Sequence, residues 1–488
     1  MRAQAPKLSD QLGDIQAILG SGFGWLTSSQ FCLLTVRDPT LAKAWLASVQ
    51  TPKLLMSIAA LNSHGDELKE KVTEAVAIAF SFDGLTALGL TESLESPFPT
   101  PFRSAMGSGL RQALLRDDAR DHWRWADRID RGCSQPVHVL VANWWKTGAA
   151  RQMPEPDPAA FWINQVDGCP SFFKPSGVYE PFGFRDGIAQ PVMYGLRVVS
   201  ETRAAAAAHM AANDPPDHDS LIAPGEFILG YRNEYDELTY TADVNGWRGS
   251  DPTVPASARF TLNGSFLAVR QIEQNVAAFR SWSTGPVGLA NAEKLVGRRC
   301  DEHGTSLGWT GARCPVSDAQ ADAFRYRVAD AEGFACPRGA HVRRANPRDS
   351  LGHDVESSIR SSKLHRLLRR GRPYRERVNG SERQGIMFIA CNADLERQFE
   401  FVHQRWLQNP RFARLEAEID PIIGVGCAPQ AFSMPGLPAG ESLSLRSFTT
   451  SLGGGYFFLP GLKALQYIQS CPPPPPPPPP NGPLPPQR

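Results

Sequence analysis

Residues 259–272, RFTLNGSFLAVRQI, decide the fold class that the sequence predicts. Arg259–Leu262 and Ser265–Ile272 are two apolar and β-branched runs, and Asn263-Gly264 between them is the strongest short-range signal for a two-residue hairpin turn. A hairpin joins antiparallel strands, and a helical stretch follows this one. The segment therefore favours an α+β fold with antiparallel sheets.

The flanking regions follow the same plan of strands mixed with helices. Phe31–Val36 predicts an apolar strand, and Asp38 after it is placed to cap a helix that runs to about Leu46. Val137–Trp144 and Gly385–Cys391 predict further strands. A helical stripe follows, formed by Leu395, Phe399, Val402 and Trp406. No glycine-rich phosphate loop comes after a first strand, which argues against a doubly wound nucleotide-binding sheet.

Composition changes divide the chain into four parts. Residues 200–224 are rich in Ala and then in Asp and Pro, which is typical of a linker. They separate an N-terminal domain, residues 1–199, from a C-terminal domain, residues 225–470. Residues 471–488 include an unbroken proline run and predict a polyproline II tail without a core. That tail is either a solvated extension or a ligand for a proline-recognition module.

The bulk composition excludes several classes of partner. Lys+Arg total 51 and Asp+Glu total 50, so no charge excess suggests nucleic acid or an acidic membrane surface as a partner. The N-terminal segment lacks the apolar stretch of a signal peptide, and no later run is long enough to span a bilayer. We therefore expect a cytoplasmic protein that acts on small molecules.

Four segments carry recognisable chemistry, and two more accompany them. In chain order they are GFRDGIAQP (183–191), NGSFLAVRQ (263–271), CPRGAHVRRANPRD (336–349), HRLLRRGRPY (365–374), GIMFIACN (385–392) and GGYFFLPG (454–461). Their shared features are Gly-x-x-Asp-Gly, an Ala-His followed by Arg-x-Asn-Pro-Arg, and an arginine four residues before a proline. In this order they resemble the dye-decolourising peroxidase family, and the resemblance extends from Asp14 to about Leu465.

The resemblance implies a fold and an activity. The fold would be two ferredoxin-like α+β domains with antiparallel sheets, similar to a dimeric α+β barrel, with non-covalent haem b in the C-terminal one. The activity would be oxidation of organic donors, such as dyes and phenolic compounds, by hydrogen peroxide through an oxoferryl intermediate. The nine cysteines agree with non-covalent haem, because they include no CxxCH attachment motif. Whether the protein is a homo-oligomer is left open.

The same resemblance assigns roles to three residues. His341 would be the proximal iron ligand, since imidazole suits an iron that cycles through a high oxidation state. Asp186 would be the distal acid–base that moves a proton between the peroxide oxygens. Arg369 would stabilise the negative charge that develops as the O–O bond breaks.

Each role has a competing interpretation. A lone histidine in a loop is more often a surface or core residue than a ligand, and Cys336 could bind haem iron as a thiolate. An aspartate beside glycine usually caps its own turn. Arg369 belongs to a basic run that could be a solvated face, and Arg370 is one register away.

Further residues complete the predicted haem site. Ile386 and Phe388 alternate on one strand face and could form an apolar wall. The proximal histidine should also have a carboxylate partner, but Arg446–Phe448 supplies no acid where some relatives have one. The residues predicted to bind the cofactor besides His341 are Arg348, which would pair with a haem propionate, Gly187, Ile188, Gln190, His365 and Phe388.

Two alternative functions remain at this point. The first is a haem-binding or haem-handling protein with weak peroxidase activity. The second is an adaptor that acts through its proline tail on a degenerate enzyme scaffold. Asp186 with Arg369 argues against the first, because simple binding needs neither a base nor a cation over the iron. The presence of His341, Asp186 and Arg369 together argues against a degenerate scaffold.

Overall fold

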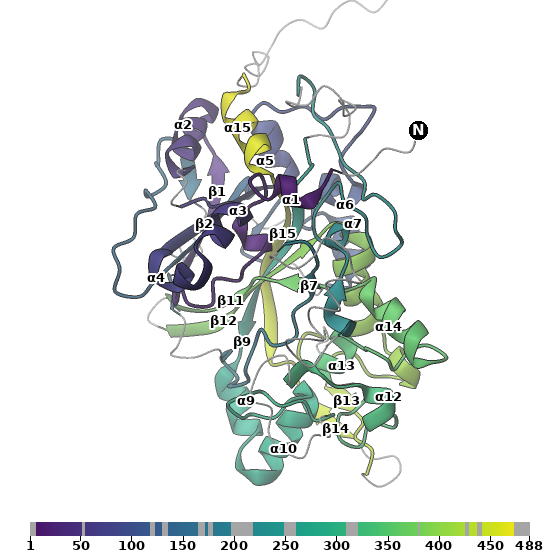
Figure 1. Ribbon diagram of the computed structural model, residues 1–488. Helices are drawn as coiled ribbons and strands as arrows, with labels where there is room; N and C mark the ends of the chain where they lie inside the picture. The colour runs from purple at the N-terminus through teal and green to yellow at the C-terminus, as the bar shows by residue number, and fades with distance from the viewer. Residues whose placement is uncertain are drawn as a thin grey trace, which may run out of the picture.

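The computed structural model describes residues 6–50, 54–117, 123–128, 135–163, 171–173, 179–196, 218–247, 260–308, 321–378, 381–424, 429–436 and 442–472. Within this part of the chain, the central feature is an 11-stranded, mainly antiparallel sheet to which both halves contribute (Figure 1). Helices cover its faces and its ends. The predicted α+β class with antiparallel pairing is confirmed.

The strands of the sheet follow an order that runs from the C-terminal half to the N-terminal half. The path is β10-β12-β9-β15-β2-β4-β1-β5, with β11 beside β12, β3 beside β15 and β6 beside β1. The bounds are β1 Ser28–Val36, β2 Glu74–Phe80, β3 Trp125–Ala126, β4 Val139–Trp145, β5 Phe161–Ile163, β6 Ser171–Phe173, β9 Ser265–Gln274, β10 Leu368–Arg369, β11 Arg372–Val378, β12 Ser381–Asn392 and β15 Thr449–Leu459.

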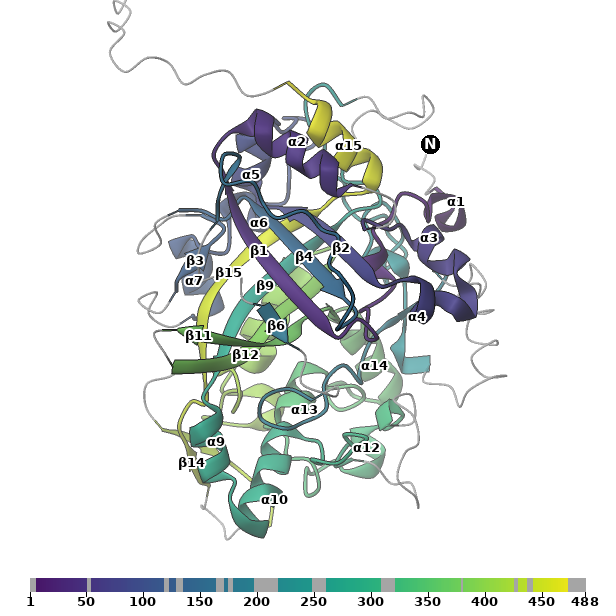
Figure 2. The ribbon, with the colours of Figure 1, turned by 90° about the vertical axis from the view of Figure 1, so that its left-hand side faces the viewer.

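The N-terminal strands and their first helix form where the sequence predicts them. Every residue of β1 is buried, which agrees with the unbroken apolar run Phe31–Leu34 within it. Asp38 accepts hydrogen bonds from the backbone N–H groups of Thr40 and Leu41 and so caps α2 (Pro39–Val49). Helix α15 (Leu462–Ser470), from the far end of the chain, packs against α2 (Figures 1 and 2).

Strand β15 joins the two halves of the chain. It pairs with β9 along its length and with β2 through Phe458 and Phe80. One buried apolar cluster contains residues of both halves, including Ile78 and Ala268. The predicted domains, residues 1–199 and 225–470, therefore share a sheet and a core, and their division remains a prediction. Most of the predicted linker and nearly all of the proline tail lie outside the described residues.

The predicted hairpin at Asn263-Gly264 is wrong, although its second strand is correct. Ser265–Gln274 forms β9, but Phe260–Gly264 is irregular, and the antiparallel neighbours of β9 are β12 and β15. Of the pair, only Asn263 has a positive φ, of 63°, whereas a type I′ hairpin turn needs two. The side chain of Asn263 is bound by Tyr231 and Asp14, so tertiary contacts determine this turn.

The remaining elements surround the sheet. Helices α9, α10, α12 and α13 lie together beyond the end of β9 (Figures 1 and 2). The predicted stripe of Leu395, Phe399, Val402 and Trp406 is buried and belongs to a helical segment with two π-helical stretches. The other bounds are α1 Leu8–Gln11, α3 Ile58–Ser63, α4 Leu68–Lys71, α5 Phe82–Ala87, α6 Thr100–Ser104, α7 Gly109–Leu115, α9 Val276–Trp282, α10 Gly285–Val296, α12 Tyr326–Ala329, α13 His341–Ala345, α14 Val355–Lys363, η7 Glu396–Glu400, η8 Val402–Leu407, β7 Val192–Met193, β8 Leu221–Ile222, β13 Gln430–Phe432 and β14 Leu443–Leu445.

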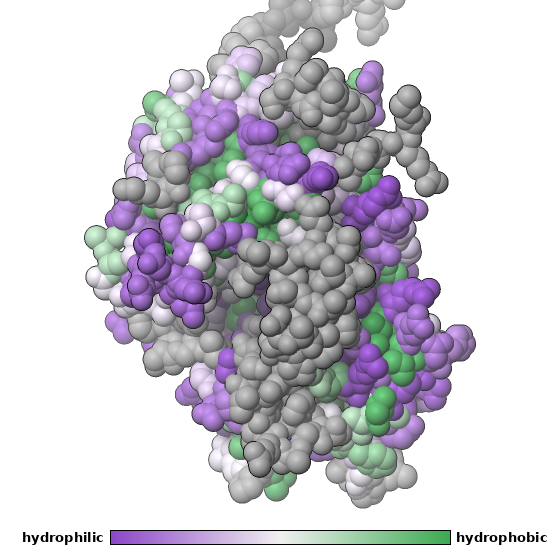
Figure 3. Space-filling view, viewed as in Figure 1, coloured by the Kyte–Doolittle hydropathy of each residue, from purple (hydrophilic) through white to green (hydrophobic). Residues whose placement is uncertain are grey.

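The surface agrees with the balanced charge of the sequence. Over α4 it is strongly hydrophilic (Figure 3), and this helix carries both acidic and basic residues. Among the described helices, none combines the length and the apolar character that crossing a membrane requires. The described cysteines, Cys32, Cys300, Cys336, Cys391 and Cys471, are free thiols, and all but Cys300 are buried.

Candidate active site

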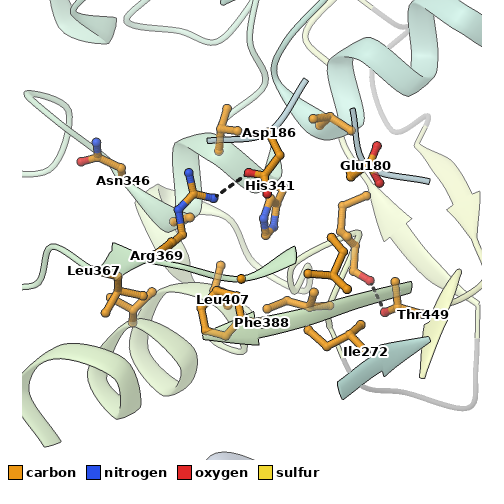
Figure 4. A pocket seen from close by; sticks show the side chains of 18 of the residues that line it. Glu180, Asp186, Ile272, His341, Asn346, Leu367, Arg369, Phe388, Leu407 and Thr449 are labelled. Carbon is orange, nitrogen blue, oxygen red and sulfur yellow. Dashed lines mark hydrogen bonds and ion pairs between the residues drawn. The ribbon is translucent and has the colours of Figure 1, made fainter. Parts of the chain in front are cut away.

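A cavity of about 390 Å³ lies between the sheet and the helices of the C-terminal half. This volume is in the range of small-molecule sites. Its floor is the sheet face on which Ile272 of β9 pairs with Ile386 of β12, next to the pair of Arg270 and Phe388. Ile386 and Phe388 thus line the cavity from one strand face, as predicted (Figure 4).

His341 projects into this cavity from the first position of α13. Its Nδ1 lies 2.9 and 3.1 Å from the two carboxylate oxygens of Asp420. Asp420 is buried and also accepts hydrogen bonds from the N–H groups of Ile422 and Ile423. The other ring nitrogen of His341, Nε2, is therefore available to a ligand in the cavity.

The His341–Asp420 pair has the electrostatics of a buried ion pair. Burial alone would lower the pKa of His341, but the charge and the hydrogen bond of Asp420 outweigh burial and raise it. For Asp420, burial would raise the pKa, but the charge of His341 and its hydrogen bond lower it. The carboxylate therefore stays ionised and increases the electron density on the imidazole.

Asp186 and Arg369 form an ion pair on the cavity wall. Arg369 Nη1 donates to Asp186 Oδ1 over 3.3 Å, although 183 residues separate them in sequence. Figure 4 shows this pair beside His341, and the charges of both residues act on the His341 pKa. Asp186 Oδ1 also accepts the Gly187 N–H at 2.6 Å, so the turn-capping interpretation and the cavity position both hold. Gly187, with φ of +84°, makes the turn possible.

The two candidate arginines point to different parts of the structure. Arg370 points to the N-terminal segment, where it donates to the carbonyl oxygens of Ile18 and Leu19. Arg369 lies on the cavity side of β10, and its backbone N–H donates to Gln190 Oε1 at 3.2 Å. Of the two candidates, Arg369 is therefore the one that lines the cavity, and its catalytic role stays a prediction.

Basic and amide groups gather at another part of the cavity wall. Arg298, Arg348 and Arg366 line it, and all three charges lower the pKa of the buried Asp322, although burial opposes them. Arg348 donates to Asp322 through its Nη1 and Nη2 atoms. Asn346 Nδ2 is buried there with no hydrogen-bond partner among the described residues. These groups suit a carboxylate ligand.

Not every predicted cofactor-binding residue reaches the cavity. Gly187, Ile188, Arg348 and Phe388 line it. Gln190 does not, and it binds the Arg369 backbone instead. His365 also lies away from it, stacked on Phe401 with its Nδ1 at the Arg397 carbonyl oxygen.

The thiolate alternative, Cys336, finds no support in the geometry. Cys336 is fully buried and does not line the cavity. Burial raises the pKa of its thiol to about 12, so the thiol stays protonated.

Sequence reasoning missed several polar residues of the site. Asp420 lies 79 residues after His341, and no local pattern links them. Arg270 forms two hydrogen bonds with Asp117 beside His403, and all three line the cavity. Glu180, six residues before Asp186, is a buried carboxyl group on the same wall.

Comparison with known proteins supports one class and one family. Residues 250–421 match the family model described as Dyp-type peroxidase, C-terminal. The chain is 26% identical over 473 residues to dye-decolorizing peroxidase AauDyP1 of Auricularia auricula-judae, covering 89% of this chain and 82% of that protein. It is 31% identical over 270 residues to multifunctional dye peroxidase DyP2 of Amycolatopsis sp., covering 48% and 56% of the two chains.

Solved structures show the same fold. The DyP-type peroxidase of Anabaena sp. superposes with a TM-score of 0.70 at 21% identity, over 95% of this chain and 98% of the other. A fungal DyP-type peroxidase from Auricularia auricula-judae gives 0.69 at 22% identity, over 94% and 99%. Together, the comparisons define the class of this protein as haem-dependent peroxidase. Within that class, the family-model match and the curated relatives support the DyP-type peroxidase family.

Proposed function

We propose that this enzyme uses hydrogen peroxide to oxidise organic donors such as dyes and phenolic compounds, with non-covalent haem b bound through His341. One observation carries the proposal. His341 has one nitrogen on a buried carboxylate and the other toward a cavity that also contains the Asp186–Arg369 pair. An iron ligand, a base and a cation therefore share one enclosed space.

The residues of the cavity fit a haem group. Apolar side chains of the sheet and of η8, such as Phe388 and Leu407, would contact the porphyrin ring. The unpartnered Asn346 amide and the nearby arginines provide donors for its carboxylates. No cysteine is among the described lining residues, which agrees with a non-covalent cofactor.

In this proposal, haem supplies the redox chemistry and the protein supplies orientation and proton transfer. His341 would bind the iron through Nε2, and Asp420 would fix the tautomer in which Nδ1 carries the proton. Asp186 Oδ2, which does not cap the turn, takes the proton from one peroxide oxygen and returns it to the other, so that water leaves. Arg369 stabilises the negative charge that builds up on the departing oxygen.

The test compares the wild type with Asp186→Asn after haem is supplied to both. In the wild type, we expect a ferric Soret band that changes rapidly with one equivalent of hydrogen peroxide. The variant should bind haem equally well and react roughly 10²–10⁴-fold more slowly, which is the usual contribution of a general base. Stopped-flow absorption measures both steps.

A matched control variant separates the effect of losing a turn-capping carboxylate from the effect of losing proton transfer. Asp157 also caps its own turn, through the Ala159 N–H, and it is remote from the cavity lining. Asp157→Asn should react with peroxide at the wild-type rate. If haem binds but peroxide only bleaches it in the wild type, the protein is a haem-handling one, and if no haem binds, the proposal is wrong.

A further inference from the structure

The cavity has a second polar region, distinct from the Asp186–Arg369 pair. It is formed by Glu180 and Gln274 with Thr449, Thr450 and Ser451 of β15. In Figure 4, Glu180 and Thr449 lie on one side of His341, and Asn346 lies on the other. The basic groups and this acidic region therefore occupy different parts of the cavity.

Glu180 is held in place by three hydrogen bonds. Its Oε2 accepts from Gln274 Nε2 at 2.7 Å and from the Phe182 N–H at 3.0 Å. Its Oε1 accepts from the Phe184 N–H at 2.8 Å. These contacts join the loop that carries Asp186 to the end of β9, and they fix the carboxyl group at the cavity wall.

Two buried oxygen atoms in this region have unused hydrogen-bonding capacity. Gln274 is only 5% exposed. Among the residues that the structure describes, its Oε1 and the hydroxyl of Ser451 have no hydrogen-bond partner. Buried polar atoms without a partner are unfavourable, and a ligand with a hydroxyl group would satisfy them.

The pKa of Glu180 lies close to neutral pH, mainly because the carboxyl group is buried. Burial raises its pKa to about 7, against the three hydrogen bonds that lower it, and the negative charge of Asp186 adds to the increase. Among the described residues, the Cys300 thiol is a further titratable group near Glu180, which helps to raise its pKa. From β9 and β15, the described lining residues in this region are Gln274, Thr449, Thr450 and Ser451, which do not titrate.

We propose that Glu180 and Gln274 form a binding site for phenol-type donors, in which the Glu180 carboxylate accepts the phenolic proton as the donor gives up an electron. The inference deepens the proposed peroxidase function and rests on it. The phenolic O–H bond breaks, its proton forms the O–H bond of the Glu180 carboxylic acid, and its electron goes to the peroxide-oxidised cofactor. Two phenols and one hydrogen peroxide then give two phenoxyl radicals and two waters.

A base is useful for this class of donor in particular. A phenol has a pKa of about 10 and so remains protonated at neutral pH. Its oxidation without loss of the proton would leave a charged radical cation in an apolar cavity, which is costly. A base with a pKa near the working pH is the most effective acceptor. A donor that loses only an electron has no use for Glu180.

The experiment compares guaiacol with ferrocyanide as donors for the holoenzyme. Guaiacol loses a proton and an electron, whereas ferrocyanide loses an electron only. In Glu180→Gln, we expect the ratio of kcat/KM for guaiacol to that for ferrocyanide to fall at least about tenfold. Glu302→Gln, which changes an exposed carboxylate on the adjacent loop, should keep the wild-type ratio. An unchanged ratio in Glu180→Gln, with ferrocyanide still oxidised at the wild-type rate, would overturn the proposal.

Two measurements on the wild type do not depend on how the variant folds. The kcat/KM for guaiacol should increase with pH through about 7, while that for ferrocyanide shows no such step. Infrared difference spectra of the resting protein should lose a buried carboxylic-acid band over the same pH range, and Glu180→Gln should lack that band. Without this pH step and this band, the proposal is wrong.

These outcomes are separate from a failure of the proposed function. If Glu180→Gln displaces the Asp186 loop, both donors slow together, and the wild-type measurements then decide. If the wild type fails to react with peroxide whichever donor is present, the peroxidase proposal itself is wrong.

Discussion

Replacing Asp420 with asparagine tests the role assigned to His341. In the wild type, Asp420 Oδ1 accepts the N–H groups of Ile422 and Ile423, and Oδ2 is the nearer oxygen to His341 Nδ1. The asparagine oxygen would keep the two backbone bonds. Its NH₂ group would then face His341 Nδ1, and a donor there requires Nδ1 to be the acceptor. The proton would move to Nε2, the nitrogen that should bind iron.

The expected size of the effect follows from this change of tautomer. Loss of the hydrogen-bond partner of a metal-binding histidine typically costs about 10- to 100-fold in affinity or activity. That range corresponds to about 1.4–2.7 kcal/mol. It agrees with the roughly 1.5–3 kcal/mol of a hydrogen bond to a charged group. We therefore expect haem to dissociate about 10- to 100-fold faster from Asp420→Asn.

The assay is transfer of haem to excess apomyoglobin, followed by absorption, together with the peroxide reaction rate of the loaded enzyme. Asp236→Asn is the control, because Asp236 has an exposed side chain far from this contact. Wild-type haem retention and a wild-type peroxide rate in Asp420→Asn would refute the assignment of His341 as the iron ligand supported by Asp420.

Two further predictions address the arginine register and the buried ion pair. Arg369→Leu should slow the peroxide reaction by about 10²–10³-fold in stopped-flow measurements, whereas Arg370→Leu should react normally, because its guanidinium binds Ile18 and Leu19; equal effects would contradict the register. The second prediction concerns how the stability of the apoprotein depends on pH. Since the pKa of His341 is raised, its ion pair with Asp420 stabilises the apoprotein fully below the ordinary value of 6.5. This stabilisation is lost as pH rises through the raised pKa. The pKa of Asp420 is lowered, so the contribution is also lost as pH falls through that value, below the ordinary 3.8. The difference in Tm between wild type and His341→Gln should thus be larger at about pH 5 than at about pH 9, and an equal difference would contradict the ion pair.

The sequence predicted the parts of the site that short motifs carry. His341, Asp186 and Arg369 belong to segments whose order resembles one family, and all three line the same cavity. The strands that build the cavity floor were visible because buried strands are long apolar runs. The α+β class was also correct, although the hairpin used to infer it does not form. The Asn-Gly signal there is real as a turn, but Asp14 and Tyr231 determine its geometry.

The residues that the sequence did not reveal act through tertiary contact alone. Asp420 lies in an irregular segment where an Asp-Pro pair predicts only a turn, and its contact with His341 depends on how that segment folds back. Glu180 is charged and near glycine, which in sequence is typical of an exposed loop. Its burial arises because β9 ends beside it and offers Gln274. His365 shows the opposite case, since a motif position predicted to bind the cofactor holds a side chain that stacks on Phe401 and contacts the Arg397 carbonyl oxygen.

The site depends on both halves of the chain, and the sheet explains how. The family model match, residues 250–421, contains His341, Arg369 and Asp420 but not Asp186 or Glu180. Those two carboxyl groups come from a loop that precedes the predicted linker, and Gln274 and Arg369 hold the loop at the cavity. Because β15 pairs with β9 on one side and β2 on the other, the strand that begins at the cavity also fixes the N-terminal strands. A shift between the halves would therefore separate Asp186 from His341, and the shared core keeps them in register.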